Sequence, residues 1–107
     1  GKRRVYFAFD SSSIDDENRT IIEVHAAHLS ANKNLKVVFE GHADERGTRE
    51  YNLALGERRA QAVDRMAKLL GVGADRVKVV SYGEEKPVAM DHNEAAWALN
   101  RRVEIIY

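Results

Sequence analysis

Two charged residues, Asp44 and Arg59, have the types and positions expected of a binding site. Asp44 lies in a charged loop that follows the apolar segment 35–39, and Arg59 lies in the long helical pattern after that loop. On a helix with 3.6 residues per turn, Arg59 falls within an apolar stripe, between Leu55 and Val63. A guanidinium in such a stripe is costly to bury unless its charge is paired. Arg59 therefore needs a specific explanation.

Two interpretations of Arg59 stay open on the pattern alone. Its side chain could reach solvent or pair with a structural carboxylate. Alternatively, it could offer two parallel N–H groups to the carboxylate of a ligand. Asp10 ends another apolar segment, 5–9, and would emerge beside Asp44 if the two strands are parallel neighbours. Turn chemistry explains either aspartate singly, but two acids and one arginine would together suit a ligand that carries both an ammonium and a carboxylate.

The elements that must position these residues alternate between strands and helices. Thr48 is a plausible N-cap of the long helix, Gly71 is typical of its C-terminal end, and Gly41 is expected to break the second strand. This alternation predicts one domain over residues 1–107, an α/β chain of the α+β two-layer type. Its mixed four-stranded sheet would carry the helices on one face, with parallel neighbours across the helices and an antiparallel final pair. Strands are predicted at 5–9, 35–39, 77–81 and 102–107, and helices at 15–30, 49–70 and 93–98.

Composition excludes several classes of protein. The 107 residues are 44% hydrophobic and 32% charged, with a net charge of zero, so a nucleic-acid partner is not expected. The absence of cysteine excludes a disulfide, a thiolate metal site and a cysteine nucleophile. No segment approaches the roughly 18 apolar residues that span a bilayer. The start at Gly1-Lys2-Arg3 is typical of a piece of a longer protein, and any signal or anchor would lie upstream.

A hydrolase that depends on a metal or on acid–base groups is a remote alternative. His42 and Asp44, with Glu45 nearby, could be imagined in such a role. However, His25 and His28 belong to a separate helix, and the spacing of a zinc hydrolase motif, a glycine-rich phosphate loop and a serine elbow are all missing. We therefore expect a protein without catalytic residues, metal or cofactor. His42 is expected to fix its loop through a hydrogen bond.

A resemblance to a known family covers essentially the whole chain. The motifs are those of OmpA-like peptidoglycan-binding domains. The run Glu40–Thr48 is similar to that of the lipoprotein members that belong to the Gram-negative Tol system. The matching residues are Phe9-Asp10, Gly41-His42-Ala43-Asp44, Gly47, Tyr51-Asn52, Leu55, Arg58-Arg59-Ala60 and Asn100-Arg101-Arg102-Val103-Glu104.

The resemblance implies non-covalent binding of the meso-diaminopimelate residue in peptidoglycan stem peptides. It implies that Asp44 takes the ammonium of diaminopimelate and that Arg59 takes its carboxylate. The same pocket would be lined by Phe9 and Asp10 and shaped from the helix by Asn52 and Leu55.

The resemblance also implies partners and a location. The domain would lie at the periplasmic face of the outer membrane, tethered through an upstream lipid anchor, and would hold that membrane to the cell wall. It would also bind the periplasmic β-propeller protein of the Tol system (TolB), through a surface that overlaps the peptidoglycan site. A porin or a flagellar stator protein, which carry similar domains, is the alternative parent.

Two positions depart from the family pattern. Ala43 replaces a familiar threonine, so any hydroxyl contact there is missing. Gly56 stands where many relatives have serine, and glycine costs about 1 kcal/mol of helix propensity against alanine. The sequence offers no local reason for Gly56.

Overall fold

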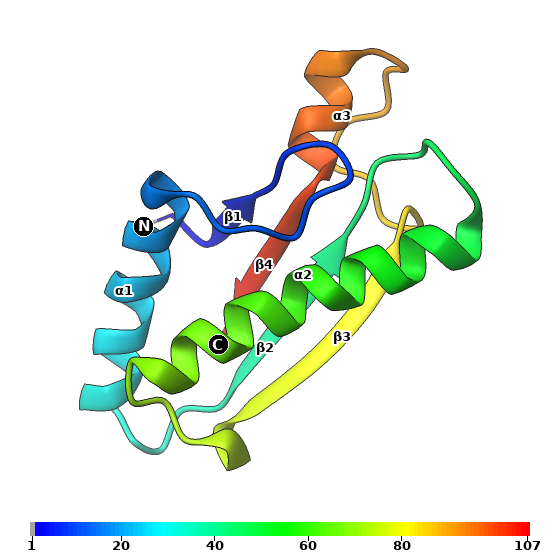
Figure 1. Cartoon of the computed structure of the whole chain (residues 1–107). Coiled ribbons are helices and arrows are strands. Elements are labelled where there is room, and N and C mark those ends of the chain that lie inside the picture. The colour runs from blue at the N-terminus through cyan, green and yellow to red at the C-terminus, as the bar shows by residue number, and fades with distance from the viewer. Residues whose placement is uncertain (1) are drawn as a thin grey trace.

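Strands and helices alternate along the chain, as the computed structural model in Figure 1 shows for residues 2–107. The predicted elements are all present within these residues, and Gly1 lies outside them. The elements are β1 (Arg4–Tyr6), α1 (Asp16–Ala31), β2 (Val37–His42), α2 (Arg49–Leu69), the 3-10 turn η1 (Ala74–Arg76), β3 (Val77–Gly83), α3 (Glu94–Asn100) and β4 (Arg102–Ile106).

The four strands form one mixed sheet in the order β1-β4-β2-β3. β2 and β3, joined through α2, are parallel neighbours, as predicted. The expectation that the first two strands are neighbours is wrong, because β4 lies between β1 and β2 and is antiparallel to both. The last two strands run in opposite directions but do not pair, since β2 separates them. The C-terminal strand thus occupies the middle of the sheet, where Val103 and Ile105 are fully buried.

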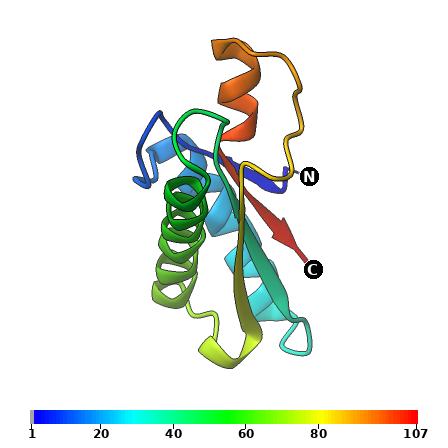
Figure 2. The same ribbon diagram turned by 90° about the vertical axis from the view of Figure 1, so that its right-hand side faces the viewer.

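Helices α1 and α2 cover one face of the sheet, and within residues 2–107 no helix covers the other face (Figure 2). α3 stands beyond the end of the sheet from which β4 begins (Figures 1 and 2). The core fills the space between the two long helices and the sheet. Its members include Phe7, Ile22, Leu29, Val37, Phe39, Val63, Val103 and Ile105.

The first strand is shorter than predicted. The segment 5–9 was expected to be a strand, but pairing ends at Tyr6. The chain then turns, with the Ser11 amide donating to the Ala8 carbonyl oxygen at 3.2 Å. Asp10 has a φ of 53°, in the left-handed region that aspartate tolerates better than most residues. This turn carries Phe9 and Asp10 away from the sheet and toward α2.

The second strand does not break at Gly41 but continues to His42. The reason for glycine there is the close approach of α2. A Cβ on Gly41 would lie 1.7 Å from the carbonyl oxygen of Gly56, and a Cβ on Gly56 would lie 2.4 Å from Ser81 Oγ. The two glycines therefore let α2 lie directly against β2 and β3. This explains Gly56, and it brings Arg59, three residues farther along α2, to the end of β2.

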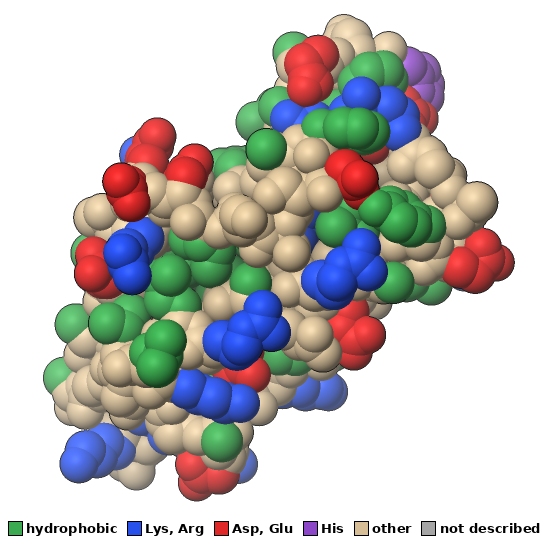
Figure 3. All heavy atoms as spheres, in the orientation of Figure 1, with side chains coloured by type: hydrophobic (Ala, Val, Ile, Leu, Met, Phe, Trp, Pro, Cys, Tyr) green, Lys and Arg blue, Asp and Glu red, His purple; other side chains and the backbone are tan. Residues whose placement is uncertain are grey.

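The ends of α2 are those expected. Thr48 Oγ1 accepts a hydrogen bond from the Tyr51 amide at 3.1 Å, and Gly71 has a φ of 99° just beyond the helix. Acidic and basic side chains are interspersed on the face shown in Figure 3, in keeping with the net charge of zero. No helix within residues 2–107 is long and apolar enough to cross a membrane.

Candidate binding site

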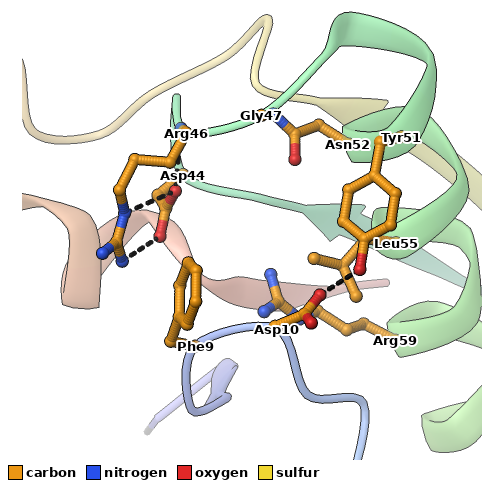
Figure 4. Close-up of a pocket in the computed structure, with 9 residues that line it drawn as sticks. All are labelled: Phe9, Asp10, Asp44, Arg46, Gly47, Tyr51, Asn52, Leu55 and Arg59. Atoms are coloured by element: carbon orange, nitrogen blue, oxygen red, sulfur yellow. Dashed lines mark hydrogen bonds and ion pairs between the residues drawn. The ribbon is translucent and has the colours of Figure 1, made fainter.

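A cavity of about 200 Å³ lies where β2 leaves the sheet (Figure 4). Its wall comes from the loop after β1, the loop after β2 and the first turns of α2. All six residues predicted for the site line it, together with three that were not predicted as site residues. The predicted residues are Phe9, Asp10, Asp44, Asn52, Leu55 and Arg59, and the others are Arg46, Gly47 and Tyr51.

Arg59 is fully buried beside this cavity, so it does not reach solvent. Its guanidinium donates to three backbone carbonyl oxygens: Nε to Ser11 at 2.8 Å, Nη1 to His42 at 2.8 Å and Nη2 to Ala8 at 3.1 Å. Within residues 2–107, no carboxylate lies at ion-pair distance from it. A guanidinium has five N–H groups, so these bonds leave one N–H on each terminal nitrogen.

Burial lowers the pKa of Arg59 to about 10, although the charge of Asp44 partly opposes this. The side chain is thus still a cation at neutral pH. The three carbonyl oxygens fix its position but bring only partial charges. A buried cation in this state favours an anion placed against its two remaining N–H groups.

Asp44 supplies the negative charge of the site and is only 5% exposed. Its Oδ1 accepts from the backbone amide of Arg46 at 2.9 Å, and its Oδ2 lies 2.8 Å from Nη2 of the same residue. Arg101 Nη1 lies 3.5 Å from Oδ2. Burial alone would raise the pKa of Asp44, but the hydrogen bonds from Arg46 hold that pKa below its usual value. Asp44 is therefore ionised at neutral pH.

Arg46 is the main site residue that the sequence reasoning missed. Its guanidinium carbon lies 4.1 Å from the ring centroid of Phe9 and 4.1 Å from that of Trp97. Trp97 is in turn held by Glu45, whose Oε2 accepts from the indole Nε1 at 2.8 Å. The one sequence signal for Arg46 was its place in the loop, two positions after an acid. Its stacking on Trp97 could not be predicted, because the two residues are distant in sequence.

The remaining wall of the cavity combines polar and apolar side chains. The Tyr51 hydroxyl donates to Asp10 Oδ1, which raises the pKa of Tyr51. Asn52 is buried and donates from Nδ2 to Glu84 Oε1 at 2.9 Å. Leu55 is buried against the cavity and contributes an apolar surface. The first turns of α2 thus present a polar and an apolar group on one face.

His42 does not take part in the cavity through its side chain. Its ring stacks on Tyr82, with 5.7 Å between centroids, and burial followed by the charge of Arg102 lowers its pKa to about 4. Neither ring nitrogen has a hydrogen-bond partner within residues 2–107, so the expected loop-fixing role of the side chain is wrong. The backbone carbonyl of His42, and not its side chain, ties this segment to α2 by accepting a hydrogen bond from Arg59. An acid–base pair of His42 and Asp44 is not formed.

The arrangement suits a small zwitterion. It combines a cation with two unused N–H groups, an anion, and apolar side chains in a cavity too small for a large ligand. Among residues 2–107, no group of three or more His, Cys, Asp or Glu side chains is placed to hold a metal ion. The opposite charges of Arg59 and Asp44 in one cavity wall support ionic recognition.

Comparison with known proteins places this chain in a family of peptidoglycan-associated proteins. The OmpA family matches residues 6–101. The peptidoglycan-associated lipoprotein of Pseudomonas putida is 56% identical over 100 residues, which cover 94% of this chain and 60% of that protein. That of Pasteurella multocida is 52% identical over 103 residues, or 96% of this chain and 69% of that protein. The chain thus spans about 60% of the length of the Pseudomonas putida relative.

Solved structures include one relative of high identity and more distant ones. The crystal structure of the peptidoglycan-associated lipoprotein from Burkholderia pseudomallei has a TM-score of 0.97 at 50% identity, covering 99% of this chain and 90% of that one. The C-terminal domain of MotB from Helicobacter pylori has a TM-score of 0.87 at 23% identity, covering 99% and 84%. The MotB likeness extends to the fold alone, so it does not favour the stator alternative. This chain belongs to the OmpA family and, within it, to the peptidoglycan-associated lipoproteins.

Proposed function

We propose that this domain binds peptidoglycan non-covalently by holding the meso-diaminopimelate residue of its stem peptides in the cavity. The observation that carries the proposal is Arg59, a buried cation without an acidic partner among residues 2–107. A ligand carboxylate supplies the missing charge and accepts from the two unused N–H groups. Because a carboxylate has two oxygens, it matches one N–H on each terminal nitrogen.

The second half of the ligand is its ammonium, which we assign to Asp44. This carboxylate is ionised, buried and part of the same cavity wall. Figure 4 shows the Asp44 carboxylate and the Arg59 guanidinium at separate parts of that wall. The apolar surfaces of Phe9 and Leu55 would contact the methylene chain of the ligand. A cavity of about 200 Å³ admits the end of one side chain, so the rest of the stem peptide stays outside.

This assignment makes the carboxylate the basis of specificity. A lysine-containing stem peptide has the ammonium but lacks the neighbouring carboxylate. Its binding would leave Arg59 buried without a counter-ion. Sites built to bind a polar group discriminate strongly against ligands that lack it, because their own buried groups are left unpaired. The domain should therefore prefer diaminopimelate-type over lysine-type walls.

Calorimetric titration with two stem peptides tests the proposal. The peptides differ only in carrying diaminopimelate or lysine, and the first should bind at least about tenfold more tightly. Asp44→Asn should weaken both, because both offer an ammonium, and Asp75→Asn, an exposed acid in η1, should weaken neither. Equal affinity of the wild-type domain for the two peptides would contradict the proposed role of Arg59.

The wider setting is also proposed. The names of the relatives support a lipoprotein that associates with peptidoglycan, and hence a domain at the periplasmic face of the outer membrane that anchors this membrane to the cell wall. A lipid anchor would lie upstream of the chain. The run Glu40–Thr48 supports membership of the Tol system, with its periplasmic β-propeller protein as a partner. We propose a binding module and not an enzyme, since the cavity offers ionic recognition without a catalytic group.

A further inference from the structure

The place at Asp44 that we assign to the ligand ammonium is already filled by another cation. The Arg46 guanidinium donates from Nη2 to Oδ2 at 2.8 Å and from Nε to Oδ1 at 3.3 Å. Its carbon also lies 4.1 Å from the ring centroids of both Phe9 and Trp97. Figure 4 shows the Asp44 carboxylate pointing to this guanidinium. An incoming ammonium would meet a carboxylate whose two oxygens both have a partner.

We propose that Arg46 is an internal competitor for Asp44 that sets how tightly any ammonium-bearing ligand binds, an inference that rests on the function proposed above. In the free domain its guanidinium occupies the ammonium position at Asp44. A ligand binds only when its own ammonium replaces that guanidinium. Ligands that offer an ammonium alone gain little from this exchange, because they break one ion pair to make another. A ligand that also offers a carboxylate to Arg59 gains a second, uncontested ion pair.

Arg46 can leave Asp44 without being buried elsewhere. Its side chain is 33% exposed, whereas that of Asp44 is 5% exposed. The Phe9 ring over it is 58% exposed, so one side of the stack opens to solvent. Glu94, an exposed acid at the start of α3, lies near enough to attract the guanidinium. The backbone amide of Arg46 also donates to Asp44, and this bond holds the loop when the side chain moves.

Such a competitor lowers the affinity for every ligand that uses Asp44. The apparent dissociation constant equals the intrinsic one divided by the fraction of molecules in which the site is free. If Arg46 fills the site in about nine-tenths of the molecules, the ligand binds about tenfold more weakly. The apparent dissociation constants of the diaminopimelate and lysine peptides rise by the same factor. The lysine peptide, which already binds more weakly, then binds too weakly to occupy the site. A ligand without an ammonium is unaffected.

Replacing Arg46 distinguishes a competitor from an ordinary binding residue. Arg46→Ala, titrated with the diaminopimelate stem peptide, should bind about tenfold more tightly than wild type. The same peptide acetylated on the free diaminopimelate amine should gain nothing. The matched control is Arg49→Ala, which removes an exposed arginine paired with Glu85 at the start of α2 and should leave both affinities unchanged. Equal or weaker binding by Arg46→Ala would overturn the inference, while wild-type binding would keep the proposed function intact.

Tryptophan fluorescence of the wild-type protein offers a second test, with one variant as its control. Trp97 is the single tryptophan of the chain, and displaced Arg46 would uncover its ring. Tryptophan emission should therefore change with ligand concentration and saturate with the calorimetric constant, and Arg46→Gln should lose most of this change. Unaltered emission at saturating peptide would overturn the inference. Absence of any peptide binding, by wild type and by Arg46→Ala alike, would overturn the proposed function together with it.

Discussion

Two buried arginines, Arg59 and Arg102, lie in different regions of this domain and differ in one respect. Both are at most 2% exposed, and both donate to backbone carbonyl oxygens. Arg102, on the face of the sheet without helices, also donates from Nε to Glu104 Oε2 at 2.7 Å. Arg59, beside the cavity, has only carbonyl partners within residues 2–107.

The comparison separates a structural arginine from the one that we propose for ligand binding. Arg102 has its counter-ion within the fold, so its charge is satisfied when the protein is folded. Arg59 has a cavity where a counter-ion would be. Equal burial thus has opposite meanings in the two regions. The counter-ion of a buried arginine tells more about its role than its exposed fraction does. A buried charge that has no counter-ion within the fold gains one only when a ligand binds.

The largest expected effect is on the structural side of this comparison. Arg102→Ala removes a buried side chain and leaves Glu104, which is 24% exposed, with only Arg4 as an ion-pair partner, so we expect a loss of about 3 kcal/mol of stability. Urea unfolding of the wild type and the variant measures this loss. The fraction that stays folded should bind the diaminopimelate peptide as the wild type does. A loss of affinity in folded Arg102→Ala would break the distinction between the two arginines.

The next effect concerns binding. Arg59→Lys keeps the positive charge but loses the guanidinium fork. Weakening a buried charged pair costs at least about 2 kcal/mol, so affinity for the diaminopimelate peptide should fall by at least roughly thirtyfold. Calorimetry measures the affinity, and circular dichroism checks the fold. The exposed neighbour provides the control, since Arg58→Lys should bind normally. Undiminished binding by Arg59→Lys would make Arg59 as structural as Arg102.

A smaller effect should follow from moving the helix that carries Arg59. In Gly56→Ala, the new methyl group would lie 2.4 Å from Ser81 Oγ and 2.9 Å from the Gly41 carbonyl oxygen. Overpacking of this kind costs about 1–3 kcal/mol, and the helix must shift away from β2. Stability and affinity should therefore fall together, whereas Ala54→Ser on the exposed face of α2 should change the affinity little. Stability lost without affinity would show that Arg59 tolerates a displaced helix.

The smallest effect is the pH dependence of stability, which arises near Arg102. His42, beside Arg102, has a folded-state pKa of about 4, below the ordinary 6.5. Between these values the unfolded chain binds a proton that the folded protein does not, so stability falls as the pH falls. The expected slope is about 1.4 kcal/mol per pH unit between roughly pH 6 and 5. Urea unfolding at several pH values measures it, and His42→Phe should lack this contribution. An unchanged slope in His42→Phe would remove His42 as its source.

The sequence, with its family resemblance, was sufficient for the class of fold and for most of the cavity wall, but not for Arg46, Gly47 and Tyr51. Hydrophobic periodicity located the helices, and Thr48 and Gly71 marked the ends of α2 correctly. The anomalous position of Arg59 on its apolar stripe also led to the cavity. These signals are local, and local patterns can be read from one chain.

Strand order and side-chain partners could not be read in this way. The sequence favours direct pairing of the first two strands, because no local pattern shows that β4 lies between them. The contacts of Arg46 with Trp97, and of Gly56 with Gly41, join residues that are far apart in the sequence. The three carbonyl oxygens that hold Arg59 were likewise not predicted. Their positions depend on turns whose place in space only the assembled fold defines.

The central position of β4 has a consequence for biosynthesis. The cavity wall from Phe9 and Asp10 follows β1, and β1 pairs only with β4, where Arg4 lies opposite Glu104. Of the four strands, β1 is made first, and it has no place in the sheet until β4, the last of the four, has been made. A nascent or prematurely ended chain that lacks residues 102–106 would not hold this wall against α2. Binding competence would then appear only once the C-terminal strand has been synthesised, so that incomplete chains do not compete for ligand.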